Sequence, residues 1–108
     1  MADAAKLDQV FKALGDRTRR QVLKQLTSGP ASVSDLAAPF QLALPSFMQH
    51  MRMLEEAGLV ESRKEGRVRI YKLHRSGLRP LESWLGTQQR VWEKRLNQLD
   101  NYLLEGKK

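Results

Sequence analysis

Residues Pro45–Val60, with the sequence Pro-Ser-Phe-Met-Gln-His-Met-Arg-Met-Leu-Glu-Glu-Ala-Gly-Leu-Val, decide the fold because they combine an amphipathic helix with a sharp stop. Phe47, Met51 and Leu54 recur at the spacing that buries one stripe of a helix. Gly58 suits the left-handed residue that ends a helix, and the apolar pair after it begins an extended segment. We therefore expect a helix that stops abruptly and is followed by a strand.

The other side of this helix is polar, and its residues have the chemistry of a DNA-reading surface. A Gln amide bonds adenine in a bidentate manner, a Ser hydroxyl serves base or phosphate, and a Met thioether covers a thymine methyl. We expect the first two turns to face bases, with Gln49 as the main reader, and Arg52 further along to contact phosphate. The residues so assigned are Ser46, Met48, Gln49, His50 and Arg52. Exposed polar side chains without a partner remain the alternative for any one of them.

The segment after Gly58 has the pattern of a basic hairpin, which would form a wing beside the helix. Glu65 and Gly66 suit a tight turn at its tip. Arg67 and Arg69 alternate with Val68 and Ile70, so we expect the apolar pair to pack and the guanidinium groups to face outward. Guanidinium groups suit phosphates or a narrow minor groove. The basic residues assigned to DNA contact are Arg63, Lys64, Arg67 and Arg69. A solvated hairpin that uses arginine for solubility is the alternative.

The charge of the chain supports a polyanionic partner. The formal net charge is +7 over 108 residues. Six basic residues lie between Arg63 and Arg75 against Glu65 alone, so the positive field is strongest in the expected wing. Double-stranded DNA is the partner that such a field favours.

Three shorter helices should precede the reading helix. Apolar residues at helical spacing predict a first helix over about residues 4–14, closed by Gly15. Asp16 is a suitable N-cap for a second helix, which the breakers around Gly29 end. Ser32 is a suitable N-cap for a short third helix that ends before Pro39. With the reading helix and a final one, this gives about five helices and a small β-hairpin, a mainly α winged helix-turn-helix.

The final helix, predicted over about residues 79–104, carries more apolar surface than one small domain buries. Its main stripe comprises Leu81, Leu85, Gln88, Trp92, Leu96, Leu99 and Leu103. A subunit interface would cover this surface, so we expect a homodimer; packing within one chain is the alternative. We treat residues 1–108 as one winged-helix domain, with the helix-turn-helix at about 33–57, the wing at about 60–73 and the dimerisation helix last.

Several function classes are excluded or disfavoured. The chain has no cysteine, so thiolate catalysis and thiolate metal sites are absent. His50 and His74 are far apart and have no partner at ligand spacing, so we predict no metal site and no cofactor. The sequence has no glycine-rich phosphate loop and no nucleophile elbow, so we predict no enzyme. No apolar run approaches the roughly 18 to 20 residues of a membrane span, and no signal-peptide core is evident, so we expect a cytoplasmic protein that does not contact membrane.

In their order and spacing, four segments together resemble the ArsR/SmtB family of winged-helix repressors: Phe11–Arg19, the helix Pro45–Leu54, the stop Glu56–Val60 and the strand Gly66–Tyr71. The resemblance covers about residues 7–99. It implies a homodimer held by the first and last helices that binds an imperfect palindrome near a promoter and represses transcription. On that basis the candidate interface residues are Leu7, Phe11, Trp92, Leu96 and Leu99, together with Leu85 on the same stripe.

The chain departs from the metal-sensing members of that family. Those members use Cys on the third helix or near the N-terminus, or His and acidic ligands on the last helix, whereas here the third helix offers Asp35 alone and the last helix has no His. Gln49-His50 stands where many members have Ser-His or His-His, which implies a different preferred operator. An effector, if one acts, would be a small organic ligand or a protein. A protein-interaction module without DNA binding is the competing function, although such a module has no reason to concentrate positive charge on one hairpin.

Overall fold

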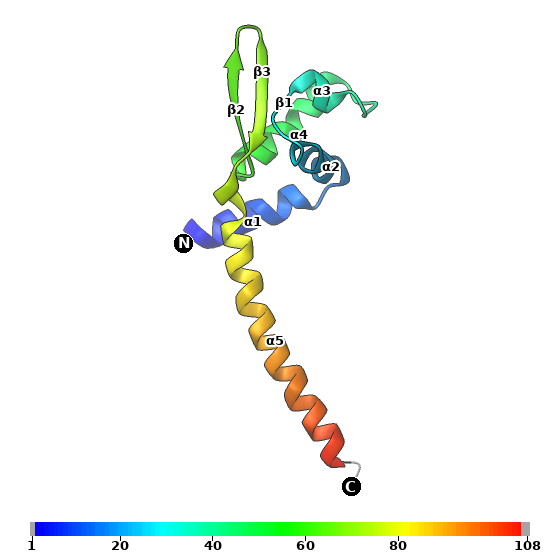
Figure 1. Cartoon of the computed structure of the whole chain (residues 1–108), viewed down its shortest axis with the longest axis vertical. Coiled ribbons are helices and arrows are strands. Elements are labelled where there is room, and N and C mark those ends of the chain that lie inside the picture. Colours follow the sequence, from blue (N-terminus) through cyan, green and yellow to red (C-terminus); the bar gives the residue numbers. More distant parts are fainter. Residues whose placement is uncertain (1, 107–108) are drawn as a thin grey trace. The chain divides into compact units, whose positions relative to one another are not determined.

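The computed structural model describes residues 2–106, and the chain divides into two compact units, one up to Leu78 and one from Arg79 onward. The first unit contains four α-helices, three strands and a 3-10 helix, and the second is a single helix (Figure 1). In chain order the elements are α1 (Ala2–Leu14), α2 (Arg17–Leu26), β1 (Ala31–Ser32), α3 (Val33–Ala37), α4 (Leu44–Glu56), β2 (Val60–Glu65), β3 (Val68–Leu73), η1 (Arg75–Leu78) and α5 (Arg79–Gly106). This element order confirms the predicted mainly α, winged helix-turn-helix class.

The helix starts follow local rules that the sequence shows. The Asp16 carboxylate accepts a hydrogen bond from the backbone N–H of Arg19 at 3.1 Å and so caps α2. The Ser32 hydroxyl accepts from the backbone N–H of Asp35 at 3.1 Å and caps α3. Both caps were predicted. Pro45 stands in the first turn of α4, where its missing N–H leaves no helical bond unmade.

The core of the first unit forms where α1 packs on α2 and α4, and where α4 packs on the base of the hairpin. The predicted stripe of α4 is completely buried, and α1 and α2 contribute their own apolar stripes. Phe40, in the turn before α4, stacks on Phe47 with ring centroids 5.8 Å apart. The buried apolar residues are Val10, Ala13, Val22, Leu26, Leu36, Phe47, Met51, Leu54, Ala57, Leu59, Val60 and Tyr71.

The sheet has the order β1-β3-β2 with antiparallel pairing throughout. The short strand β1 was not predicted; it pairs Ala31 with Tyr71 and Ser32 with Ile70. Two residues are too few to show the alternation that marks a strand in sequence. The hairpin of β2 and β3 extends beyond the helices of its unit, so only its base reaches the core (Figure 1).

Two glycines form a tight contact at the end of the first unit. Gly58 has a φ of +78°, as expected for the residue that ends α4. Gly77 lies directly against it, so that a Cβ at position 77 would stand 2.0 Å from the Gly58 carbonyl oxygen. Because that oxygen belongs to the backbone, no side-chain movement relieves the clash. Gly77, which lies within η1, therefore cannot be replaced by a residue with a Cβ unless the backbone moves.

The second unit is the helix α5, which runs without a break from Arg79 through Gly86 to Gly106. No residue of α5 is buried within one copy of the chain. Its tryptophans, Trp84 and Trp92, meet edge to face with ring centroids 6.3 Å apart. Large apolar side chains continue along its exposed surface to Leu104. Among residues 2–106, no helix combines the length and the hydropathy needed to cross a membrane.

We expect Gly77→Ala to lower the free energy of unfolding by about 1–3 kcal/mol or more, because the new methyl group must displace the Gly58 carbonyl. Urea denaturation would measure the loss. Gly15→Ala is the matched control: its Cβ would meet its nearest neighbours at an ordinary 3.4 Å, so its effect should stay within about 0.5 kcal/mol. Equal stability of both variants would contradict the tight contact.

Asp16 should make the stability of the fold depend on acidic pH. Partial burial acts to raise its pKa, but the hydrogen bond from the backbone N–H of Arg19 and the electrostatic effects of the nearby His50 and Arg19 side chains outweigh this and hold the pKa below its ordinary value of 3.8. Because the folded-state pKa is lowered, the stabilisation is present above 3.8 and is lost as the pH falls through the folded-state pKa.

Two substitutions at this position separate the cap from the charge. Asp16→Ala should cost about 0.5–2 kcal/mol at neutral pH through loss of the cap. Asp16→Asn keeps a capping oxygen but does not titrate, so it should flatten the acid limb of the stability profile while staying close to wild type at neutral pH. Thermal melts across the acidic range would show this, and an unchanged acid limb in Asp16→Asn would contradict it.

Candidate nucleic-acid interface

The helix α4 presents a polar surface because its apolar stripe is fully buried. Ser46, Gln49 and Arg52 are exposed, and Met48 and His50 are half-buried. The first turn carries no acidic residue, and the N-cap, Ala43, has no side-chain acceptor for the free backbone N–H groups. The N-terminal end of the helix therefore keeps its positive dipole end open to an anion. All five residues assigned to DNA contact on this helix lie at its surface.

Gln49 and Arg52 are hydrogen-bonded to each other on that surface. Arg52 donates through Nη2 to Oε1 of Gln49, one helical turn away. The bond uses one of the two lone pairs of the Gln49 amide oxygen and leaves the NH₂ group as a donor. Gln49 can therefore bond adenine through both ends of its amide while Arg52 still donates to it.

The ring of His50 contacts Arg19 of α2 and the N-cap of that helix, Asp16. Sequence reasoning did not anticipate these contacts. Arg19 Nη1 lies 2.9 Å from His50 Nδ1, and Asp16 Oδ2 lies 3.7 Å from the same nitrogen. Arg19 is itself buried, with 9% of its surface exposed. The sequence around Arg19 reads as a basic helix segment, and its only signal of burial is its place three residues after the cap and three before Val22.

The charged residues of the hairpin divide between its two faces. The cross-strand pairs Ser62–Tyr71 and Lys64–Arg69 share one face, because alternate residues of a strand point the same way. This face is buried at its base through Tyr71, and Arg69 extends it toward the tip. Burial, and next the carboxylate of Glu55, raise the pKa of Tyr71, which keeps its phenol protonated.

A short chain of hydrogen bonds joins that face to α4. Arg69 donates through Nη1 to the Ser62 hydroxyl at 2.9 Å, and the same hydroxyl donates to Glu55 Oε1 on α4 at 2.8 Å. Lys64 and Arg69, two cations, stand directly opposite each other. Like charges in that position destabilise a hairpin. The arrangement becomes favourable when a polyanion lies against the face.

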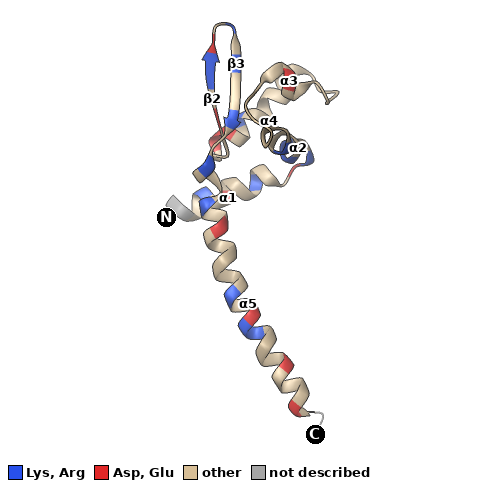
Figure 2. Ribbon diagram, viewed as in Figure 1, with Lys and Arg blue, Asp and Glu red and all other residues tan. Residues whose placement is uncertain are grey.

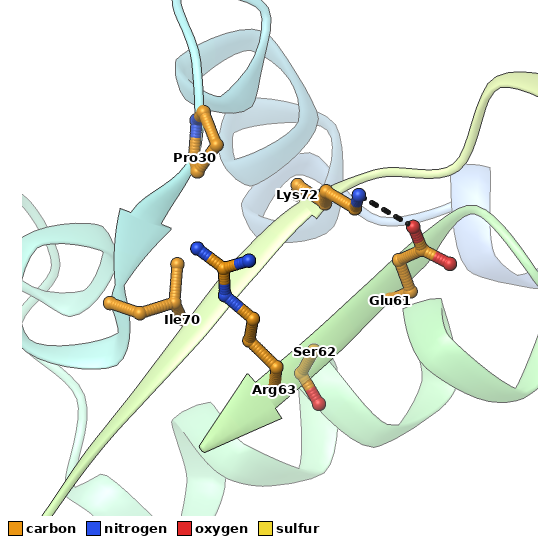
Figure 3. A pocket seen from close by; sticks show the side chains of 6 residues that line it. All are labelled: Pro30, Glu61, Ser62, Arg63, Ile70 and Lys72. Atoms are coloured by element: carbon orange, nitrogen blue, oxygen red, sulfur yellow. Dashed lines mark ion pairs between the residues drawn. The ribbon is translucent and has the colours of Figure 1, made fainter. Parts of the chain in front are cut away.

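On the opposite face of the hairpin, each cation is paired with a carboxylate of the same face. Arg63 pairs with Glu65 at 2.6 Å, and Lys72 pairs with Glu61 at 3.2 Å. Three of these residues, Glu61, Arg63 and Lys72, border a pocket of about 360 Å³ in which Arg63 extends beside Ile70 (Figure 3). Figure 2 shows basic residues on both strands; within the described part of the hairpin, both strand cations of the first face lack the ion pair to a carboxylate that Arg63 and Lys72 make. The structure thus separates Arg63 from Lys64 and Arg69.

The predicted packing of the second strand was wrong. Val68 is exposed and Ile70 only half-buried, whereas Tyr71, on the same face as Arg69, is buried. Arg67 lies in the turn and not in β3, which begins at Val68. The physical reason is that the hairpin extends past the core, so apolar residues near its tip have nothing to pack against.

No group of three or more potential metal ligands occurs among the described residues. His74 lies after β3, where its Nε2 is 3.0 Å from the Ser76 hydroxyl, and His50 is engaged with Arg19.

The residues assigned to a subunit interface are accessible to different degrees. Leu7 on α1 is half-buried, and the rest are exposed, namely Phe11, Leu85, Trp92, Leu96 and Leu99.

Known proteins resemble this chain in sequence. The model of a helix-turn-helix domain matches residues 14–63. The chain is 36% identical over 89 residues to the HTH-type transcriptional regulator Rv2034 of Mycobacterium tuberculosis, covering 82% of this chain and 80% of that protein. It is 30% identical to the transcriptional repressor SdpR of Bacillus subtilis, covering 73% of this chain and 88% of the repressor.

Solved structures agree with the sequence relatives. One ArsR family transcriptional regulator is 47% identical and superposes with a TM-score of 0.80, over 83% of this chain and 93% of its own. An ArsR-like transcriptional regulator from Rhodococcus sp. RHA1 is 31% identical with a TM-score of 0.76, over 92% of this chain and 93% of its own. These relatives are regulators, as predicted for a chain without enzyme motifs. With its element order, its buried reading-helix stripe and its basic hairpin, the chain belongs to the ArsR family of winged helix-turn-helix, DNA-binding transcriptional regulators.

Proposed function

We propose that the protein is a homodimeric repressor that binds an imperfect palindrome, with α4 in the major groove and the hairpin on the flanking backbone. The observation that carries the proposal is the opposed pair Lys64 and Arg69, tied through Ser62 to α4. Two cations that face each other without a carboxylate between them destabilise a hairpin. An anion bound beside both cations offsets this cost. DNA phosphates beside an occupied major groove supply that anion.

The contacts divide by role. On α4, Ser46, Met48, Gln49 and His50 face the bases, while Arg52 orients Gln49 and contacts phosphate. On the hairpin, Lys64 and Arg69 contact the backbone, and Arg67 at the tip reaches phosphate or the minor groove. Arg63 remains beside Glu65 and contributes through its field more than through contact.

We infer the dimer from the exposed apolar side chains of α5 and from the spacing of operator half-sites. A helix with no buried residue and a continuous series of exposed Leu, Trp and Val side chains requires a partner surface. Two copies related by a two-fold axis would present two α4 helices to half-sites about one helical turn apart. The proposed interface includes Leu7 and Phe11 of α1 with Leu85, Trp92, Leu96 and Leu99 of α5.

The signal that releases the dimer from DNA is proposed to be an organic ligand or a protein, because the chain has no cysteine and the described residues form no cluster of metal ligands. We place its action in the cytoplasm, together with the DNA that it regulates. A mobility-shift titration at several salt concentrations, using the DNA upstream of its own coding sequence, tests the proposal as a whole. Binding that is no tighter than to random DNA would overturn it.

Three single substitutions should separate base reading from backbone contact. Gln49→Ala should cost about 1–3 kcal/mol on the operator and little on random DNA, because base contacts carry the sequence information. Lys64→Ala should weaken binding to both DNAs and reduce the salt slope by about one unit per subunit, because one fewer counterion is released. It should also raise the stability of the free protein by a few tenths of a kcal/mol, roughly, by removing the like-charge pair.

Lys72→Ala is the matched control, since it removes a lysine of the same hairpin from the other face, where Glu61 neutralises it. Its salt slope should stay close to wild type. Equal slopes for Lys64→Ala and Lys72→Ala would show that the face with Arg69 does not meet the DNA backbone.

Trp92→Ala should weaken the dimer. Trp92 is 48% exposed in one copy of the chain, and enclosing its ring at an interface would make its loss cost about 3–5 kcal/mol of dimer stability. Sedimentation equilibrium measures the change, with Glu93→Ala on the same turn as a control expected to remain dimeric. A wild-type protein that sediments as a monomer at micromolar concentration would remove the basis for palindrome binding.

A further inference from the structure

Arg19 is a buried cation whose partners lie on two other helices. Nε donates to the Ala13 carbonyl at 2.8 Å and Nη2 donates to the Lys12 carbonyl at 3.0 Å. Both carbonyls belong to the last turn of α1, the negative end of that helix, so they compensate the buried charge. Nη1 reaches α4, where it lies 2.9 Å from His50 Nδ1 and 3.2 Å from Met53 Sδ. Arg19 thus connects the end of α1 to the reading helix.

This geometry fixes the protonation of the His50 ring. A guanidinium only donates hydrogen bonds, so Nδ1 must accept from Nη1. A ring that accepts through Nδ1 is neutral and carries its proton on Nε2. The other charged group at this nitrogen, Asp16 Oδ2, is 3.7 Å away and already accepts the backbone N–H of Arg19.

The Nε2–H group is the part of His50 available to a ligand. Across residues 2–106 it has no hydrogen-bond acceptor, and 21% of the side chain is exposed. His50 and Arg19 line a surface pocket of about 440 Å³ together with Pro45, Ser46 and Gln49. The pocket therefore lies at the N-terminal end of α4, the end that meets base edges in a helix-turn-helix.

We propose that Arg19 is a positioning residue that holds His50 as a hydrogen-bond donor, and that the pocket receives a hydrogen-bond acceptor of the DNA, either a phosphate oxygen or a purine N7. The proposal rests on the proposed function, since it assumes that α4 meets DNA. It makes His50 a hydrogen-bond donor: its Nε2–H donates to acceptors such as guanine N7 or O6 and finds no partner in an exocyclic amino group.

The tautomer is tested on the wild-type protein without DNA. Nitrogen-15 NMR of the imidazole at alkaline pH should show His50 Nδ1 without a proton and Nε2 with one. A His50 ring protonated at Nδ1, or a rapid mixture of both tautomers, would overturn the role of Arg19. Because this measurement needs no DNA and no variant, it stands even if the protein fails to bind the operator, which would overturn the proposed function instead.

The donor is tested by two substitutions of His50. A Gln amide reaches the position of Nε2, whereas an Asn amide reaches only that of Nδ1. His50→Gln should therefore bind the operator roughly tenfold more tightly than His50→Asn, the value of one hydrogen bond to DNA. Equal affinities, or the reverse order, would overturn the proposal. If the acceptor is purine N7, the difference should vanish on an operator made with 7-deazapurines; if it is phosphate, the difference should persist there and on random DNA.

Arg19→Lys tests whether Arg19 acts through His50. It keeps the charge but cannot span two carbonyls and a ring, so operator affinity should fall roughly tenfold. In the double variant with His50→Asn the two losses should not add, because both remove the same donor; additive losses would mean a merely structural role. Arg20→Lys is the matched control, because Arg20 donates to the Leu14 carbonyl at 2.7 Å but is exposed and has no bond to α4. Should Arg19→Lys not fold, as judged by circular dichroism, the wild-type tautomer and the His50 pair still decide the question.

Discussion

Burial of one stripe of α4 is the constraint from which the rest of the structure follows. Phe47, Met51 and Leu54 are fully enclosed, and each contributes roughly 1.5–3 kcal/mol by leaving water. A rotation of the helix would expose them, so the orientation of α4 about its own axis is fixed by hydrophobic burial. The polar residues on the other side therefore keep their direction before any partner arrives, and binding need not spend free energy on ordering them.

The features that the sequence predicts well are those set by neighbours in the chain. The caps at Asp16 and Ser32 and the left-handed turn at Gly58 depend on residues within four positions, and all three form as expected. The stripe of α4 is also local, because helical periodicity alone defines it. These elements were enough to recover the order of the α-helices and the hairpin, and hence the fold class.

The features that sequence reasoning missed depend on residues far apart in the chain. Arg19 and His50 are separated by 31 positions. In the local sequence, only its spacing from the Asp16 cap and from Val22 distinguishes Arg19 from the exposed Arg20 beside it. The packing face of β3 was assigned wrongly because alternation shows that a strand has two faces but not how far along the strand the core extends. Only the packing of β3 on α2 and α3 shows that Tyr71, and not Val68, reaches the interior.

The ion pairs on the second face of the hairpin have a consequence for the solubility of the protein. The strand β2 is the edge of the sheet, and an edge strand offers unpaired backbone groups to any other extended chain. Its sequence, Val-Glu-Ser-Arg-Lys-Glu, places a charged residue at four of six positions. These charges protect the edge against strand-to-strand aggregation. Neutralising Glu61, Arg63 and Glu65 to simplify the charge pattern would leave one charge on the extended edge, that of Lys64, and would expose the protein to intermolecular β-pairing.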